Sequence, residues 1–264
     1  MKKIGFGIIT LVAVLAVSGV VGAEGVARYP STVLPSGQTV VVPDKAVDNS
    51  PVLEKVLFVH YKGDKVFAKP SWAGGGKGET QCYDFLAKGT YWKELPVSYV
   101  VHPDLEAVVS GAMFASAETW DAETSQELFF DVYTLDASST WDGDPGDVPD
   151  GKNELLFGNY ASDGVIAVTV VWGYFSGPPQ TRKITEFDIL FDTDYVWGNA
   201  DLDSGVMDLA NIATHELGHG VGLADIYNSA CSTVTMYGYS VEGETNKRSL
   251  EPADVKGLQE MYGA

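Results

Sequence analysis

Residues 215–225 read HELGHGVGLAD, in which two histidines lie four residues apart. On an α-helix such residues share one face, so His215 and His219 can direct ring nitrogens at a single ion. Neutral imidazole is a preferred ligand of zinc in proteins. Glu216 lies one residue further round the helix, where it can reach a water on the open side of the ion rather than the ion itself. The pattern therefore indicates a metal site that performs hydrolysis.

The residues that follow can supply a third ligand. Gly222 has no Cβ atom, so it can adopt a left-handed conformation and end the helix sharply. The chain would then turn back, and Asp225 could offer a carboxylate to the same ion. Two histidines, one aspartate and a water make a four-coordinate hydrolytic site. Glu216 would take a proton from that water and later give it to the leaving amine of a peptide bond.

Periodicity in the apolar residues predicts the elements that position this stretch. Apolar residues at helical spacing follow Asp104, which can cap a helix, and two later stretches also predict helices. The predicted helices cover 105–120, 208–221 and 252–262, and the predicted strands cover 51–61, 95–101, 128–133, 154–158, 165–174 and 184–191. This order indicates a mixed sheet with helices packed on it.

The composition excludes several classes of protein. The 17 basic and 36 acidic residues give a net charge of −19, and such a field repels the phosphates of nucleic acid. A hydrophobic fraction of 45% over 264 residues suits one large domain, or one domain with an appendage. We therefore expect a globular protein that has no nucleic acid partner. A monomer is also expected, although the composition does not address the oligomeric state.

Residues 1–23 have the pattern of a secretory signal peptide. Lys2 and Lys3 precede an apolar run over 4–21, and small residues at 21–23 predict cleavage after Ala23. The alternative is an uncleaved membrane anchor, since the run approaches the length that spans a bilayer. In both cases we expect the body of the protein to be secreted or to lie at the extracellular surface. Contact with a membrane is expected only if the segment stays uncleaved.

The two cysteines, Cys82 and Cys231, are most simply joined as one disulfide in an oxidising compartment. The alternative is that the thiolate of Cys82 blocks the metal. The glycine-rich stretch 73–78 predicts a flexible joint just before Cys82. We therefore divide the remainder of the chain into a prosegment or N-terminal extension at 24–81 and a main domain at 82–264.

The motif His215-Glu-x-x-His219-x-x-Gly222-x-x-Asp225, followed by TMYG at 235–238, resembles the zinc site of metzincin metalloendopeptidases of the matrixin type. Histidine is the usual third ligand there, and aspartate in this place resembles the minority form of snapalysin-type enzymes. Residues 92–99, 112–120 and 254–263 resemble the first strand, first helix and C-terminal helix of matrixins. The resemblance covers roughly 82–264. It implies an α+β fold with a twisted, mixed five-stranded sheet, a long first helix, the zinc-binding helix, a Met-turn at Met236 and a C-terminal helix.

Departures from the matrixin pattern are also informative. The prosegment motif Pro-Arg-Cys-Gly and the Pro-x-Tyr wall of the substrate pocket are both missing, and Gly238 stands where a switching tyrosine ligand would lie. A second, structural zinc is not expected, because only His60 and His102 remain, and we interpret both as ordinary surface or core histidines. The acidic loops are interpreted as solvated, because their spacing matches no EF-hand pattern, and calcium binding is the alternative. The candidate calcium ligands are Asp142, Asp144, Asp147, Asp150, Asp192 and Asp194.

The expected function is that of a secreted endopeptidase with one catalytic Zn²⁺, a protein or peptide substrate, and Glu216 as general base. The alternative is an exported, non-catalytic binding or cell-surface domain of the same fold, against which the presence of Glu216 argues. A further alternative takes Glu242 or Glu244 as the third ligand. Gly222 and Asp225 explain the spacing better, because no helix is predicted that would present either glutamate.

Overall fold

Two long antiparallel strands, β7 (Val165–Tyr174) and β8 (Lys183–Asp192), form the centre of a mixed sheet. They belong to a computed structural model that describes residues 31–33, 39–41, 52–63 and 81–264. β7 is covered on both faces, which explains its almost continuous run of apolar residues. The predicted signal peptide at 1–23 lies outside the described residues.

The sheet continues on both sides of this pair. Beyond β8 lie three strands that run parallel to it, and beyond β7 lies the antiparallel strand β3 (Glu54–Lys62). The order is β1-β2-β3-β7-β8-β6-β4-β5, and β11 pairs in parallel with β3. The shorter strands are β1 (Ser31–Val33), β2 (Thr39–Val41), β4 (Val100–Val101), β5 (Thr134–Leu135), β6 (Glu154–Gly158) and β11 (Tyr239–Ser240). A separate parallel pair joins β9 (Trp197–Gly198) to β10 (Met207–Asp208).

The described part of the sheet therefore has nine strands, where five were expected. The additional strands lie beyond β7. β3 pairs with the outer edge of β7 along almost the whole length of β3, and β2 and β11 pair with β3, while β1 pairs with β2. The predicted strands at 95–101 and 128–133 are much shorter than expected. They meet at a single bridge between Val97 and Phe129, and regular pairing begins only at β4 and β5.

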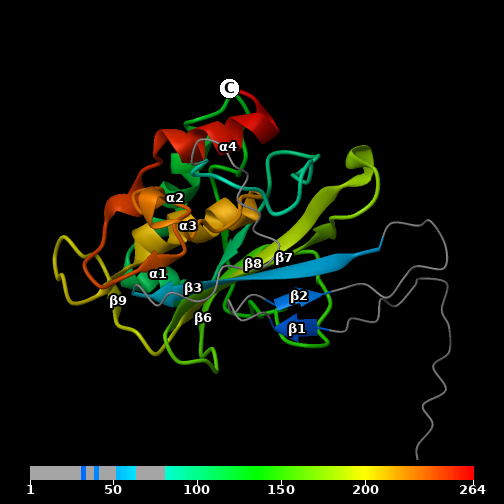
Figure 1. The fold of residues 1–264 in the computed structure, drawn as a ribbon. Coiled ribbons are helices and arrows are strands. Elements are labelled where there is room, and N and C mark those ends of the chain that lie inside the picture. The colour runs from blue at the N-terminus through cyan, green and yellow to red at the C-terminus, as the bar shows by residue number, and fades with distance from the viewer. Residues whose placement is uncertain (1–30, 34–38, 42–51, 64–80) are drawn as a thin grey trace, which may run out of the picture.

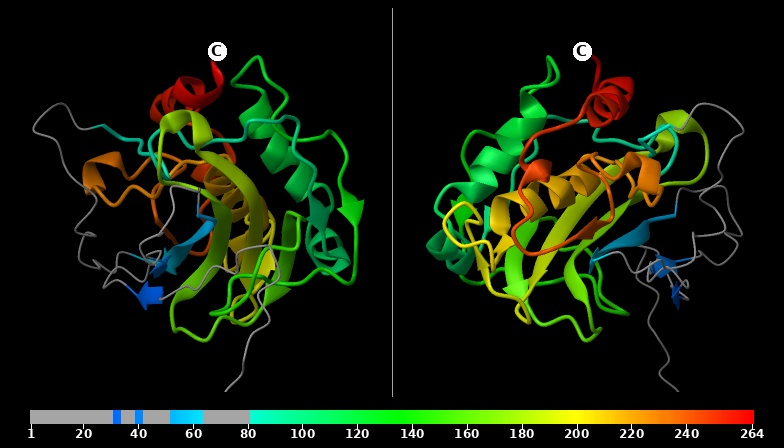
Figure 2. Two further views of the ribbon diagram at one scale, coloured as in Figure 1. Left: turned by 90° about the vertical axis from the view of Figure 1, so that its right-hand side faces the viewer. Right: turned by 60° about the vertical axis from the view of Figure 1, so that its left-hand side comes forward.

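The helices lie together on one side of the sheet, with α4 farthest from the strands (Figures 1 and 2). α3 contacts β7 and β8, and α2 packs on α3. The α-helices are α1 (Pro103–Val108), α2 (Ala112–Asp121), α3 (Leu209–Gly220) and α4 (Pro252–Tyr262), and the 3-10 helices are η1 (Pro179–Thr181), η2 (Ser229–Cys231) and η3 (Asn246–Arg248). These elements make an α+β fold with a mixed sheet and four α-helices among the described residues.

The single helix predicted over 105–120 is wrong, because the structure divides it into α1 and α2, and the stretch 112–120 that resembles the first helix of matrixins lies within α2. Gly111 lies between them with a φ of 75°, a conformation that side-chain-bearing residues rarely adopt. The carboxylate of Glu106 accepts hydrogen bonds from the Gly111 N–H and from the Ser110 hydroxyl, which fixes the break.

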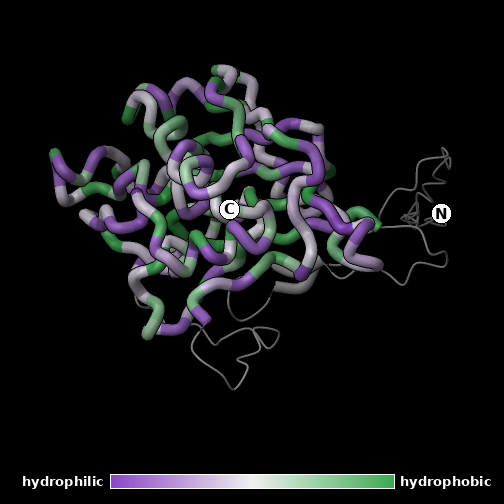
Figure 3. The backbone as a smooth tube through the Cα atoms, turned by 90° about the horizontal axis from the view of Figure 1, so that it is seen from above, coloured by the Kyte–Doolittle hydropathy of each residue, from purple (hydrophilic) through white to green (hydrophobic). Residues whose placement is uncertain are grey.

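Two apolar clusters cover the two faces of the sheet. The larger one fills the space between the strands and the helices, and it contains Trp120, Phe187 and Leu217. The smaller one lies on the opposite face, around Val168 and Trp172 of β7. Hydrophobic segments run mainly through the middle of the molecule, and hydrophilic ones recur on the outer loops (Figure 3). Among the described residues, no helix is both long and apolar enough to cross a bilayer.

Candidate metal centre

α3 carries both motif histidines in its last two turns, and both side chains are buried. The Asp208 side chain begins the helix by accepting the Asn211 N–H at 2.8 Å. The Nε2 atoms of His215 and His219 lie 3.2 Å apart, so the two rings converge on one point as the spacing predicted.

Each imidazole is oriented by its other nitrogen. Nδ1 of His215 lies 2.7 Å from the Thr235 carbonyl oxygen, and Nδ1 of His219 lies 2.9 Å from the Leu223 carbonyl oxygen. A carbonyl can only accept, so Nδ1 carries the proton and donates, and Nε2 keeps a lone pair. Burial lowers the pKa of His215 to about 4, which keeps that ring neutral at pH 7. Two lone pairs therefore face the same point.

The turn after α3 brings a carboxylate to this point. Gly222 has a φ of 108°, and its N–H donates to the His219 carbonyl oxygen at 2.9 Å. The chain then reverses, so that Oδ1 of Asp225 lies 3.2 Å from Nε2 of His215 and 3.4 Å from Nε2 of His219. A Cβ at Gly222 would also come within 3.2 Å of the Thr90 carbonyl oxygen. The turn thus requires glycine for its conformation and favours it for the space available.

The donor set and its charges fit a divalent transition metal. Ligand atoms about 2.0–2.1 Å from a tetrahedral zinc lie roughly 3.3 Å from one another, close to the three separations seen here. Burial raises the pKa of Asp225, but the charge of His219 and the close contacts of the carboxylate with both imidazoles outweigh this effect and hold the pKa well below its usual range. Burial alone would lower the pKa of His219, yet Asp225 raises it. The negative charge of Asp225 therefore favours a positive charge at this point, either a proton or a metal ion.

Glu216 lies beside this trio and outside it, fully buried. Its Oε2 accepts a hydrogen bond from the Thr169 hydroxyl of β7 at 2.6 Å, and its Oε1 lies 3.0 Å from Nδ1 of His60 on β3. Burial raises the pKa of Glu216, and its electrostatic interactions with His215 and His219 offset only part of this rise. A carboxylate with a raised pKa suits a group that must take up a proton and release it again.

Met236 packs against α3 at Gly218, which lies between the two histidines along the helix. A Cβ added at Gly218 would overlap the Met236 sulfur and would come within 2.7 Å of Trp120. The carboxylate of Asp254 on α4 accepts from the N–H groups of Thr235 and Met236, at 2.8 and 3.2 Å. The same backbone also provides the Thr235 carbonyl that orients His215.

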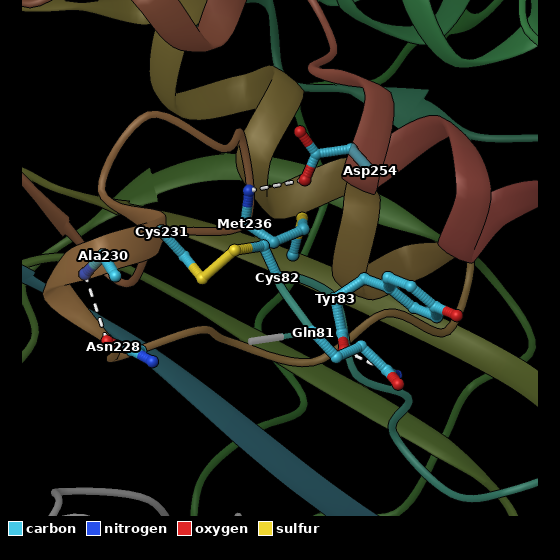
Figure 4. Close-up of a disulfide and its surroundings, with 8 residues drawn as sticks. All are labelled: Gln81, Cys82, Tyr83, Asn228, Ala230, Cys231, Met236 and Asp254. Carbon is cyan, nitrogen blue, oxygen red and sulfur yellow. Dashed lines mark hydrogen bonds between the residues drawn. A yellow bond between two sulfur atoms is a disulfide. The ribbon is translucent and has the colours of Figure 1, made fainter. Parts of the chain in front are cut away.

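A disulfide joins Cys82 to Cys231, with a Cα–Cα distance of 5.4 Å. It ties the start of the predicted main domain to the loop before Met236, close to the Asp254 contact (Figure 4). Both sulfurs are consumed in this bond, so the Cys82 thiolate does not serve as a metal-blocking group in this structure.

Two neighbours of the centre were missed by the sequence analysis. The Tyr227 hydroxyl donates to Oδ2 of Asp225 at 2.8 Å, and it can do so because position 238 is glycine. A Cβ at Gly238 would lie 2.5 Å from Cε1 of Tyr227 and 3.0 Å from Oδ1 of Asp225. The spacing of Tyr227 in the sequence does not predict this contact. The glycine at position 238, in the place of a tyrosine, was the one signal available in the sequence.

The second missed residue is His60, which was interpreted as an ordinary histidine. Besides Glu216, it contacts the hydroxyl of Ser240 on β11 through Nε2 at 3.0 Å. Burial lowers the pKa of His60 to about 3, so its contact with Glu216 is a hydrogen bond from a neutral ring. His102 lies elsewhere, where its side chain accepts the Asp104 N–H and caps α1.

One acidic cluster forms away from this centre. Ligand atoms of Asp142, Glu186 and Asp188 lie within 4.8 Å of one another, so the acidic loop at 142–150 meets β8. Burial raises the pKa of Asp188 to about 9 and that of Glu186 to about 7. Of the other predicted calcium ligands, none joins a group of this kind in the described residues: these are Asp144, Asp147, Asp150, Asp192 and Asp194.

The part of the chain that holds this centre is similar to known proteins. The matrixin family model matches residues 161–263, which run from β7 to α4. Matrilysin of Rattus norvegicus is 38% identical over 76 residues, which are 29% of this chain and 27% of that protein. Matrix metalloproteinase-16 of Homo sapiens is 35% identical over 92 residues, which are 34% of this chain and 14% of that protein. The chain thus matches well under a third of either relative. The matches support a metalloprotease of the matrixin type.

Proposed function

We propose that this chain is a zinc-dependent endopeptidase in which His215, His219 and Asp225 hold the metal and Glu216 is the general base. The observation that carries the proposal is the convergence of three buried donor atoms, 3.2–3.4 Å apart, with a fourth buried acid next to them. The matrixin similarity over 161–263 covers all four residues and supports zinc as the metal.

The chain's own groups divide the work of hydrolysis. When bound, Zn²⁺ supplies Lewis acidity, which polarises a carbonyl and lowers the pKa of water to roughly 7. Glu216 takes a proton on its carboxylate and returns it to the leaving amine. The hydroxyl of Thr169 keeps one oxygen of Glu216 in place, and the carbonyls of Thr235 and Leu223 hold both imidazoles in the metal-binding tautomer. Asp225 is held by Tyr227.

The remaining parts of the proposal concern the whole chain. We infer that residues 1–23 direct export and are removed, that 24–81 form a prosegment, and that the substrate is a protein or peptide outside the cell. The disulfide between Cys82 and Cys231 supports an oxidising location, because such bonds persist mainly in exported proteins.

The test compares Glu216→Gln with the parent chain. Casein hydrolysis is measured with zinc, before and after cleavage within 64–80, together with zinc content. We expect Glu216→Gln to bind zinc but to lose about 10²–10⁴-fold in rate, the usual contribution of a positioned base. Glu127→Gln makes the same chemical change on an exposed residue and should hydrolyse at the parent rate. Equal hydrolysis by Glu216→Gln and parent would overturn the proposal.

A second comparison decides the third ligand. Asp225→Ala should lose zinc affinity strongly, because it removes the anionic donor. Glu244→Ala should keep it, because Glu244 is engaged by Lys247 instead. The opposite result would assign the metal site to Glu244.

A further inference from the structure

β3 lies in the place where an extended peptide would meet the proposed catalytic residues. One edge of β3 pairs antiparallel with β7, and at its C-terminal end the other edge pairs in parallel with β11, through Tyr61 and Lys62. β3 is thus held between two strands of the main domain, and α3 contacts β7 on the helical side of the sheet. Figure 1 shows β3 running beside β7.

The side chains of β3 that face the helical side cover the catalytic residues. The ring of Phe58 stacks on the ring of His219, with centroids 3.9 Å apart and planes 6° from parallel. The ring of His60 lies 4.1 Å from that of His215, and its Nδ1 contacts Glu216 at 3.0 Å. Both Phe58 and His60 are buried. One strand therefore covers both proposed histidine ligands and the proposed base.

The other face of β3 anchors it to the sheet. Leu57, Val59 and Tyr61 alternate with the residues above and join the apolar cluster around Trp172. Burial of both faces stabilises the bound strand, because each Å² of apolar surface removed from water contributes about 25 cal/mol of free energy. Main-chain pairing adds affinity that does not depend on sequence, as when peptides add a strand to a sheet edge.

β3 supplies none of the three proposed metal ligands. All three lie in 82–264, as does the disulfide that fixes the turn region near Met236. β3 reaches that domain along the chain only through 64–80, which includes the glycine-rich stretch 73–78. The strand therefore behaves as a separate segment that fills the groove between β7 and β11.

We propose that β3 is an intramolecular inhibitor, which occupies the peptide groove of the protease and uses His60 to hold the general base. The inference rests on the proposed function. Thr169 already bonds one oxygen of Glu216, and His60 bonds the other, so both oxygens are engaged while β3 is in place. The strand must leave before a substrate can enter, and an entering peptide would take its position, antiparallel to β7 and parallel to β11.

The first experiment releases β3 from the full-length chain. A recognition sequence for a specific endoprotease is inserted within 64–80, and a scrambled insert of equal length is the control. Hydrolysis of a quenched fluorescent peptide is followed with zinc after cutting and dilution. Tethering keeps a segment at roughly millimolar effective concentration, so release should raise kcat/KM by about 10²-fold or more. The scrambled insert should show no gain, and circular dichroism should show that the cut protein stays folded.

The second experiment returns the strand in trans. The peptide EKVLFVHYK, which is β3 itself, should inhibit the cut protein and compete with substrate. Its His60→Ala version should inhibit about tenfold or more weakly, since it lacks a hydrogen bond to a charged group. Binding of the same labelled peptides to metal-free cut protein gives a readout independent of hydrolysis and should follow the same order.

A variant of the uncut chain covers the case in which cutting unfolds the protein. His60→Ala should raise the hydrolysis rate of the intact chain, and His102→Ala should leave it unchanged. If the intact parent hydrolyses as fast as the cut chain, or if His60→Ala brings no gain, the inhibitory role of β3 is refuted and the endopeptidase stands. If the intact chain, the cut chain and His60→Ala all bind zinc but hydrolyse no peptide, both the endopeptidase function and the inhibitory role of β3 are refuted.

Discussion

Tyr227→Phe should weaken zinc binding although Tyr227 is not a proposed ligand. The substitution removes one hydroxyl, which donates to Oδ2 of Asp225 at 2.8 Å, and it leaves the ring in place. The other oxygen of Asp225 faces Nε2 of His215 and of His219. Without the hydroxyl, the carboxylate can rotate away from the position in which it completes the trio.

The size of the effect follows from the kind of bond. A hydrogen bond to a buried charged group contributes about 1.5–3 kcal/mol. Loss of a group that orients a metal ligand usually costs 10–100-fold in metal affinity, or about 1.4–2.7 kcal/mol at 1.4 kcal/mol for each tenfold. The two estimates agree, so the dissociation constant for zinc should rise by about 10–100-fold.

The assay is competition for zinc with a chelating indicator at fixed pH. Tyr262→Phe is the matched control, because the Tyr262 hydroxyl also makes a 2.8 Å hydrogen bond, in this case to the Val221 carbonyl oxygen. The Tyr262→Phe substitution should lower the free energy of unfolding by about 1 kcal/mol and leave the zinc affinity unchanged. If Tyr227→Phe binds zinc as tightly as the parent, the positioning role of Tyr227 toward Asp225 is refuted.

Three other perturbations test separate parts of the structure. Thr169→Val should raise the pKa of Glu216, because the ionised carboxylate loses a donor, and the acid limb of the kcat/KM profile should move to higher pH. Gly218→Ala should lower the free energy of unfolding by about 1–3 kcal/mol through overpacking, with a smaller loss in Gly220→Ala. Burial raises the pKa of Asp188 to about 9, so the folded state holds a proton that the unfolded state loses near pH 4. Stability should therefore fall as pH rises from about 4 to about 9, by up to ~1.4 kcal/mol per unit, and Asp188→Asn should flatten the profile in urea unfolding.

Elements with strong periodicity were predictable within a residue or two. The predicted strands at 154–158 and 165–174 coincide with β6 and β7, and the predicted helix at 252–262 coincides with α4. In α4, Pro252 occupies the first turn and Gly263 follows the last residue, which are local signals for helix ends. Such signals depend only on neighbours along the chain.

Long-range partners could not be predicted in the same way. A strand was expected at 51–61, but its pairing with β7 and β11 depends on residues more than 100 positions away. His60 therefore looked ordinary in the sequence, although it contacts Glu216 across 156 positions. The break between α1 and α2 was a different kind of miss, since Gly111 was present as a signal and the surrounding helical periodicity outweighed it.

We propose that His215, His219 and Asp225 hold one metal ion next to Glu216. The most direct measurement is X-ray diffraction from crystals grown with zinc, with data collected on both sides of the zinc absorption edge. We predict one anomalous peak at about 2.0–2.2 Å from Nε2 of both histidines and from an Asp225 oxygen. A peak elsewhere, or a filled site with Asp225 directed to solvent, would contradict the account.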